Sequence, residues 1–572
     1  DDGGNADNAD ANDKKANDHM KYANNAAETV ENQAQDMLAG RLFFDNYVKD
    51  YSNSNPYLAV TEDLNKKLKN GLMLVNYTGH GNTTSWSDEK VLTQQMIDKF
   101  VYPKLPLWIT ATCDFCRFDA LATSAGESVF LNEKSGGIAL YTTVRVAYGY
   151  DNDEINNKFL HELFKPDLNG LYPALGDVVK EVKNSYRFKR SKNLNFTFIG
   201  DPALKLKIPS HKIRINTVNG EDAIRHTTSL RAYDEVSVEG EILAPDNSSL
   251  DNFNGRLEVK VMDSKVEITT RNNFKNDTAF KYKDYKNLIY KGSTMVQNGK
   301  FNFSFYVPGN ISYSGAAGKM ILYAADSDQK IEAKGNFTNY TVKGTSDNPV
   351  EDHEGPEILK LYLNDSTFVS GDKVNATPFF YAHLWDQTGV DITEGGVGHD
   401  IMLMIDNKPF TSYNLNSYYD NVFGRKGEGE VRFGIPQLSA GEHEAVFKVW
   451  DIKGNPTTHT FRFNVVEGLK PFITNVIATP TPARGNVEFH ITHNRPESRM
   501  KVGIMVYDMT GRLHWKHEET GSSELFKDYT IDWDLRNNSG THVRPGVYIY
   551  RAAVSTDNSK EATEAKKMII LW

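Results

Sequence analysis

Two apolar runs within residues 72–113, each followed by a chemically reactive side chain, constrain the fold of this chain most. The first run, LMLV at residues 72–75, continues through NYTG to His80 and Gly81. The second covers residues 105–112 and leads directly into Cys113. A continuous apolar run bounded by turn residues is typical of a parallel strand that is buried on both faces. We therefore expect His80 and Cys113 at the carboxyl ends of two strands, where ligands and chemistry gather in such sheets.

The separation of His80 and Cys113 favours a thiolate–imidazole pair. The two residues are 33 positions apart with one predicted helix between them, which is one βαβ step and places them on adjacent or near-adjacent strands. Because cysteine is only a few per cent thiolate at neutral pH, a cysteine hydrolase needs an imidazole to take the proton. Glycines flank His80, and the N–H groups of Gly81 and Cys113 are natural donors to an oxyanion. The alternative is a core cysteine beside a histidine in a turn.

Cys113 and Cys116 are the only cysteines, and their CxxC spacing allows three interpretations. A redox pair normally opens a helix in a thioredoxin-type unit, which the surrounding pattern does not predict. A zinc site would need two further ligands, and the sequence has neither a second CxxC nor an HxxxH. The third interpretation, which we favour, makes one cysteine a nucleophile and gives the other no role.

Residues 1–207 alternate between helical and strand patterns, which predicts βαβ units and a mainly parallel sheet. We expect strands at 42–47, 72–78, 105–112 and 137–142, helices at 22–38, 61–69, 88–100, 125–133, 153–164 and 175–191, and a closing segment NFTFIGDP at 195–202. Residues 1–21 form a tract rich in Asp, Asn, Ala and Gly, which predicts a solvated loop. Its oxygen-rich spacing could bind Ca²⁺ as a structural ion, although no complete calcium loop is present. We expect this α/β domain to be truncated at its N-terminus.

The helical pattern ends after residue 207, and short strand-like runs separated by turn residues follow. We expect all-β sandwich modules at 208–350, 356–467 and 470–572, with the charged, proline-bearing stretch 345–355 as a linker between the first two. The segment 443–466 alternates strand, turn and strand as in an immunoglobulin-like sandwich. A formal net charge of −10 gives no reason to expect nucleic acid as a partner.

The order of motifs in residues 1–207 resembles the gingipain-type (C25) cysteine peptidases, which have a caspase-like fold. The matching elements are NYTGHG at 76–81, Cys113, the strand GGIALYTT at 136–143 and the closing FTFIGDPALKL at 196–206. The resemblance implies that Cys113 is the nucleophile, that His80 is the general base and acid, and that the N–H groups of Gly81 and Cys113 bind the oxyanion. Members also use an early acidic residue to orient the histidine. Asp1 or Asp2 is the nearest match, and we take Asp2.

Further segments resemble one branch of this family, the cell-surface sortases of the type IX secretion system of Bacteroidetes. They are ATCDFCRFD at 111–119, GPEILKLYLND at 355–365, AGEHEAVFKVWDIKGN at 440–455, and VYDMTGRLHW and IDWDLRNNSGTHVRPGVYIYR in the C-terminal unit. The resemblance implies an enzyme on the outer face of the outer membrane. It would remove the C-terminal signal domain of secreted cargo proteins and transfer the cargo, through a Cys113 thioester, to an anionic lipopolysaccharide acceptor.

Residues 470–572 resemble the secretion signal domain that such cargo carries. The resemblance implies docking on an outer-membrane β-barrel of the PorV type, together with other attachment-complex subunits such as PorQ and PorZ. A generic sandwich that only aids solubility is the alternative.

Two other functions stay open on the sequence alone. One is a secreted gingipain-type endopeptidase, whose preference for Lys or Arg would demand an acidic pocket. The sequence places neither Asp114 nor Asp119 in such a pocket. The other is a non-catalytic surface scaffold in which the α/β domain supports binding only.

Overall fold

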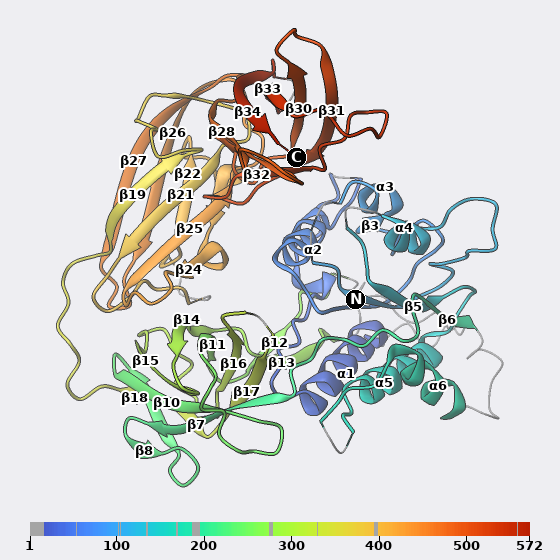
Figure 1. Ribbon diagram of the computed structural model, residues 1–572. Helices are drawn as coiled ribbons and strands as arrows, with labels where there is room; N and C mark the ends of the chain where they lie inside the picture. Colours follow the sequence, from blue (N-terminus) through green and yellow to red (C-terminus); the bar gives the residue numbers. More distant parts are fainter. Residues whose placement is uncertain are drawn as a thin grey trace.

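The computed structural model describes residues 17–571 except 53, 101, 103, 133–134, 168–169, 186–194, 274–277, 329, 394–397 and 557–558. An α/β domain comes first, and the α-helices of the described residues all lie in it (Figure 1). Modules built of β-strands follow, from the green strands in the lower left of Figure 1 to the red C-terminal strands at the top.

A four-stranded sheet in the order β1-β4-β5-β6 forms the centre of the α/β domain. The strands β1 (Leu74–Thr78), β4 (Leu107–Ala111) and β5 (Ala139–Thr143) are parallel, and β6 (Phe196–Ile199) runs antiparallel to β5. Every residue of β4 is buried, because helices cover both faces of the sheet. The mainly parallel sheet predicted for residues 1–207 is therefore present.

Helices cover the two faces of this sheet in two layers (Figure 1). Apolar side chains at helical spacing face the sheet, such as Val60, Leu64 and Leu68 on one side and Ile155, Phe159 and Leu163 on the other. The first layer contains α2 (Leu58–Asn70), α3 (Gln94–Ile97) and α4 (Ala125–Leu131). The second contains α1 (Asp18–Gln33), α5 (Gly149–Leu163) and α6 (Leu175–Ser185).

Some predicted elements of the α/β domain were wrong. The strand predicted at 42–47 is instead the short 3₁₀ helix η1 (Phe44–Asn46). The buried Asp45 carboxylate accepts hydrogen bonds from the N–H groups of Asn272 (2.8 Å) and Asn273 (2.6 Å), so a loop of the next module takes the place of a strand neighbour. The predicted helix 88–100 is the hairpin strand β3 (Leu92–Thr93), paired with β2 (Ser85–Trp86), followed by the four residues of α3.

Helix boundaries at the two ends of the domain also differ from the prediction. Helix α1 begins at Asp18, inside the tract predicted as loop, and ends at Gln33 rather than at residue 38. Helix α6 covers Leu175–Ser185, and the rest of the predicted helix, residues 186–191, lies outside the described residues. The proposed Ca²⁺-binding part of the tract, with Asp1 and Asp2, also lies outside the described residues.

Residues 208–350 form one curled sheet rather than the two facing sheets of the predicted sandwich. The sheet order is β14-β11-β16-β17-β7-β10-β15, and its two end strands meet again as the arms of a hairpin through a bridge between Gln297 and Lys300. Apolar residues of all these strands share a single core. Its strands are β7 (His211–Val218), β8 (Glu221–Asp222), β10 (Glu235–Leu243), β11 (Gly255–Met262), β14 (Leu288–Val296), β15 (Lys300–Tyr306), β16 (Lys319–Asp326) and β17 (Glu332–Phe337). Two ribbons flank it, β9 (Thr228–Ala232) with β18 (Tyr340–Thr345), and β12 (Val266–Thr269) with β13 (Lys281–Asp284).

The two remaining modules each have two facing sheets around one apolar core. The module at 356–467 packs β19 (Glu357–Leu363), β21 (Phe379–Trp385), β25 (Glu428–Gly434) and β24 (Tyr419–Asn421) against β20 (Lys373–Val374), β27 (Pro456–Val465), β26 (Gly441–Trp450), β22 (Met402–Ile405) and β23 (Ser412–Asn414). The C-terminal module packs β28 (Ile473–Thr479), β29 (Val487–His493) and β32 (Tyr529–Trp533) against β31 (Leu513–Gly521), β30 (Met500–Asp508), β33 (Gly546–Ser555) and β34 (Ala562–Ile570).

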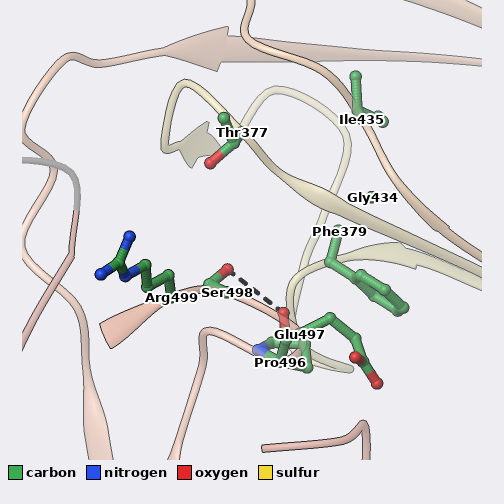
Figure 2. Close-up of a pocket in the computed structure, with 8 residues that line it drawn as sticks. All are labelled: Thr377, Phe379, Gly434, Ile435, Pro496, Glu497, Ser498 and Arg499. Atoms are coloured by element: carbon green, nitrogen blue, oxygen red, sulfur yellow. Dashed lines mark hydrogen bonds between the residues drawn. The ribbon is translucent and has the colours of Figure 1, made fainter. Parts of the chain in front are cut away.

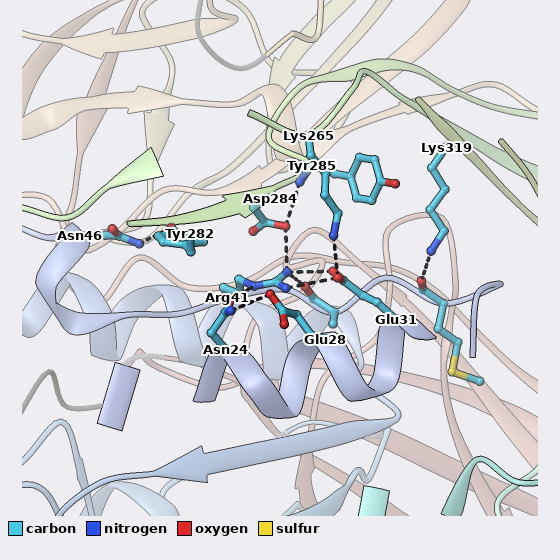
Figure 3. Close-up of polar contacts among 12 residues, drawn as sticks. Asn24, Glu28, Glu31, Arg41, Asn46, Lys265, Tyr282, Asp284, Tyr285 and Lys319 are labelled. Carbon is cyan, nitrogen blue, oxygen red and sulfur yellow. Dashed lines mark hydrogen bonds and ion pairs between the residues drawn. The ribbon is translucent and has the colours of Figure 1, made fainter. Parts of the chain in front are cut away.

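A buried polar network joins the α/β domain to the first β-module (Figure 3). The Arg41 side chain, only 1% exposed, donates to Glu31 of α1 at 2.8 and 3.2 Å and to Asp284 of β13 at 3.1 Å. Lys265 also donates to Glu31, at 2.7 Å. Burial alone would raise the pKa of Glu31, but the hydrogen bonds from Arg41 and Lys265 hold it below its ordinary value. The network therefore fixes α1 against the β-module.

The later modules also contact their neighbours. Lys66 of α2 donates to Ser417 and lies 4.3 Å from the ring centre of Tyr418, at the 3₁₀ helix η4 (Asn416–Tyr418) of the module at 356–467. A pocket lies where that module meets the C-terminal one (Figure 2). Its lining comes from both modules: Thr377, Phe379, Gly434 and Ile435 from one, and Pro496, Glu497, Ser498 and Arg499 from the other.

Candidate active site

Strands β1 and β4 bring His80 and Cys113 to the same edge of the sheet. The two strands pair directly, and their register matches Thr78 with Ala111. Because each residue of β1 faces the residue 33 positions later, the same register continued by two residues matches His80 with Cys113. The hydrogen bond from the Gly79 N–H to the Ala111 carbonyl, at 3.4 Å, shows that the pairing extends past the end of β1.

The backbone at Gly81 passes very close to the strand that carries Cys113. A Cβ atom on Gly81 would lie 2.4 Å from the Thr112 Oγ1 atom and 3.2 Å from the Ser85 carbonyl oxygen, so only glycine fits there. The His80 carbonyl is held by the Ser87 N–H and by the Tyr77 hydroxyl, both at 2.8 Å. The turn that presents His80 and the Gly81 N–H is therefore fixed against β4.

The Cys113 thiol is half-buried and contacts the backbone of the loop that follows β5. Its Sγ donates to the Ala147 carbonyl at 3.2 Å, and the Ala147 N–H approaches Sγ at 3.5 Å. A carbonyl contact stabilises the protonated thiol, so formation of the thiolate needs a base such as the imidazole of His80. Asp114 has φ of 50°, so the chain turns sharply directly after Cys113.

Cys116 has a different environment, which fits the interpretation that gave it no chemical role. Its side chain is fully buried, and both cysteines are free thiols. Burial, together with the charge of Glu127, raises the pKa of Cys116 to about 11, so it stays protonated at neutral pH. Its N–H donates to the Thr143 carbonyl at 3.0 Å, which ties the loop after Cys113 to β5.

His19 lies against His80 and was missed by sequence reasoning. The two rings meet edge to face with centroids 4.7 Å apart. His19 is 4% exposed and is the second residue of α1, a helix that packs against β1 and α5. A histidine inside a tract predicted as loop gives no signal of this kind. Asp2, the predicted orienting residue for His80, lies outside the described residues.

Trp86, which follows the His80 turn, is a packing residue rather than a pocket wall. It is 3% exposed and stacks on Tyr77 with ring centroids 4.2 Å apart. Trp108 and Phe115 contact its other sides. This aromatic group supports the turn that presents His80.

One group of carboxylates within the described residues could share a cation, and it lies outside the α/β domain. Ligand atoms of Asp352, Asp386 and Asp451 lie within 4.8 Å of one another in the module at 356–467 and the stretch that precedes it. Burial raises the pKa of Asp386 to about 6, and the neighbouring charge of Asp451 adds to the rise. In the described part of the chain no such group includes Cys113 or Cys116, so a zinc site there gains no support.

The α/β domain matches a known family model. Peptidase family C25 is matched by residues 2–207, a range that contains both His80 and Cys113. Residues 2–207 belong to peptidase family C25. Family C25 is a family of cysteine peptidases, and His80 and Cys113 both follow strands of the matched domain.

Comparison with solved structures finds relatives that match more of this chain than residues 2–207. Latent dimeric PorU from Porphyromonas gingivalis is 34% identical, with 77% of this chain and 41% of that chain covered and a TM-score of 0.34. The Arg-specific cysteine proteinase gingipain R is 14% identical, with 57% of this chain and 62% of that one covered and a TM-score of 0.29. The chain thus spans less than half the length of the PorU chain. The comparison with curated proteins finds no match.

None of the helices in the described residues combines the length and apolar character that a membrane-spanning helix requires.

Proposed function

We propose that this chain is a cysteine endopeptidase in which Cys113 is the nucleophile and His80 the general base and acid. The observation that carries the proposal is the parallel register of β1 and β4, which pairs Thr78 with Ala111 two residues before His80 and Cys113. The half-exposed Cys113 contrasts with the buried Cys116, whose raised pKa keeps it inert. Membership of residues 2–207 in a cysteine peptidase family supports the same roles.

The acylation step follows from this arrangement. His80 takes the Cys113 proton, and the thiolate attacks a peptide carbonyl to give a tetrahedral oxyanion. The N–H groups of Gly81 and Cys113 would stabilise that charge, and the close approach of the Gly81 backbone to Thr112 supports this role. The carbon–nitrogen bond then breaks, His80 returns its proton to the leaving amine, and a thioester remains on Cys113. Asp2 is proposed to orient His80.

The fate of the thioester separates two activities. Water gives simple hydrolysis, whereas an amine attacks the thioester carbonyl, gives a proton to His80, expels the Cys113 thiolate and leaves the acyl group in a new amide bond. We propose the second route, with secreted cargo proteins as acyl donors that lose their C-terminal signal domain and an anionic lipopolysaccharide-linked amine as acceptor. The likeness to PorU at 34% identity over 77% of this chain supports this substrate class.

The same likeness supports a place for the protein on the outer face of the outer membrane of a Bacteroidetes bacterium. There the C-terminal module would dock on a β-barrel partner of the PorV type, beside subunits such as PorQ and PorZ.

A gingipain-type endopeptidase that prefers Lys or Arg is the alternative, and the charges near the site weigh against it. Arg145 donates to the Asp119 carboxylate at 3.0 and 2.5 Å, and Arg117 lies 4.0 Å from Asp114. Both acids that could attract a cationic side chain therefore already face arginines. The non-catalytic scaffold does not account for a glycine that holds an N–H group close to the strand bearing Cys113.

Cells that carry Cys113→Ala test the proposed cargo reaction. We expect cargo proteins to keep their C-terminal signal domains and to leave the cell surface, because neither cleavage nor acyl transfer can start without the thiolate. Mass spectrometry of cargo C-termini provides the measurement, and Cys116→Ala provides the matched control with normal processing. Unchanged removal of the signal domains in the Cys113→Ala cells would contradict the sortase activity, even if the purified chain cleaved other peptides.

A further inference from the structure

Two loops beside Cys113 expose large apolar side chains. One loop follows β4, and the other joins β5 to α5. The exposed fractions of these side chains range from 47% to 110%. We call this set the apolar rim: Phe118, Leu121, Val146, Tyr148 and Tyr150.

Direct contacts bring the two loops together around the nucleophile. The Asp119–Arg145 ion pair links the loop after β4 to the loop after β5. The Asp114 N–H donates to the Arg145 carbonyl at 3.3 Å, and the backbone of Ala147 contacts the Cys113 Sγ. Val146 and Tyr148 thus flank Ala147, whose backbone contacts the Cys113 Sγ, and the ion pair holds the loop that carries Phe118 and Leu121 beside them. We therefore expect a peptide whose carbonyl reaches the Cys113 Sγ to contact the rim.

The charges in these loops pair with one another rather than form an acidic pocket for a cationic side chain. The hydrogen bonds from Arg145 lower the pKa of Asp119, so the carboxylate stays ionised and paired. The Asp114 side chain, 18% exposed, faces Arg117. A substrate with Lys or Arg beside the scissile bond would have to displace an arginine from one of these acids, whereas an apolar side chain would bury against the rim.

We propose that the apolar rim makes this enzyme select peptides with aromatic or aliphatic, not cationic, side chains directly before the scissile bond. The inference rests on the proposed peptidase function and adds its substrate class. The rim residues act by contact with the substrate and not on the reacting atoms, so their loss raises KM more than it lowers kcat.

Fluorogenic peptides that differ only in the two residues before the scissile bond test the proposal on the full chain. We expect kcat/KM for Phe or Leu at these positions to exceed that for Lys or Arg by about tenfold or more. The double variant Tyr148→Ser/Tyr150→Ser should lose most of this preference through a higher KM. Met509→Ser, which changes an equally exposed apolar residue of the C-terminal module, should keep it.

The outcomes separate the two proposals. Cleavage that favours Lys or Arg would overturn the proposed role of the apolar rim, and so would a preference for Phe that survives in the tyrosine double variant. Either result would leave the proposed peptidase function standing. A folded chain that cleaves no peptide of the set would overturn the peptidase function itself.

Arg145→Gln provides an independent arm of the same test, since it leaves the rim in place and frees the Asp119 carboxylate. The ratio of kcat/KM for the Lys and Arg peptides to kcat/KM for the Phe and Leu peptides should then rise by several-fold. An unchanged ratio of cationic to apolar cleavage would contradict the assignment of Arg145 as the group that excludes cations.

Discussion

Replacing His80 by alanine should lower kcat/KM for peptide cleavage at neutral pH by about 10²–10⁴-fold, because no other group is assigned to take the Cys113 proton. The remaining rate should rise with pH toward the ordinary cysteine pKa of about 8.5, since the thiolate then forms without a base. The gap between His80→Ala and the wild-type chain should therefore narrow above that pH. A pH–rate profile of the two proteins, with peptide as substrate, measures both effects.

His161→Ala is the matched control for this change. His161 lies on α5, its side chain is 43% exposed, and it pairs with Glu162. It has no role in the proposed mechanism. We expect its kcat/KM and pH profile to match the wild type. A His80→Ala variant that cleaves peptides at the wild-type rate while folded would remove His80 from the mechanism.

Replacing Arg41 by methionine should lower the free energy of unfolding of the α/β domain by about 3–5 kcal/mol at neutral pH. The change leaves Asp284 without a cation and Glu31 with Lys265 alone, at a site where the Arg41 side chain is only 1% exposed. Because the pKa of Glu31 is lowered in the folded chain, its contribution is present above its ordinary pKa and is lost as the pH falls through the folded value. The decrease in the free energy of unfolding caused by Arg41→Met should therefore be smaller at acid pH.

Urea denaturation followed by the helical circular-dichroism signal measures this loss, since the α-helices of the described residues lie in the α/β domain. Arg214→Met is the control. It removes an ion pair with Glu241 whose arginine is 46% exposed, and exposed pairs contribute only about 0–1 kcal/mol. Equal losses for the two arginine variants would contradict the stabilising role of the buried network.

The sequence predicted those parts of the fold that depend on local pattern. Apolar runs at β1 and β4 indicated buried parallel strands, and their separation of 33 residues is the register that the structure has. Residues 42–47 and 88–100 were predicted wrongly because their conformation depends on partners distant in sequence or on a hairpin. Alternating apolar residues could not separate a sandwich from the curled sheet of residues 208–350, because both bury one face of each strand.

The candidate site was predictable only where it lies on strands. His80, Gly81 and Cys113 follow from strand ends and a glycine turn, whereas His19 reaches His80 only through the packing of α1. The rim residues lie in two loops and, for Tyr150, in the first turn of α5, and their closeness to Cys113 depends on contacts such as Asp119 with Arg145, 26 residues apart. Asp2 stays a prediction.

Alkylation of the two thiols by iodoacetamide tests the central claim, an activated Cys113, most directly. With a pKa of about 11, Cys116 is thiolate only to about one part in ten thousand at pH 7. Peptide mapping by mass spectrometry should therefore show Cys113 modified at least ~100-fold faster than Cys116, because an active Cys113 is a few per cent thiolate or more. Slow modification of both thiols at equal rates would contradict the assignment of Cys113 as the nucleophile.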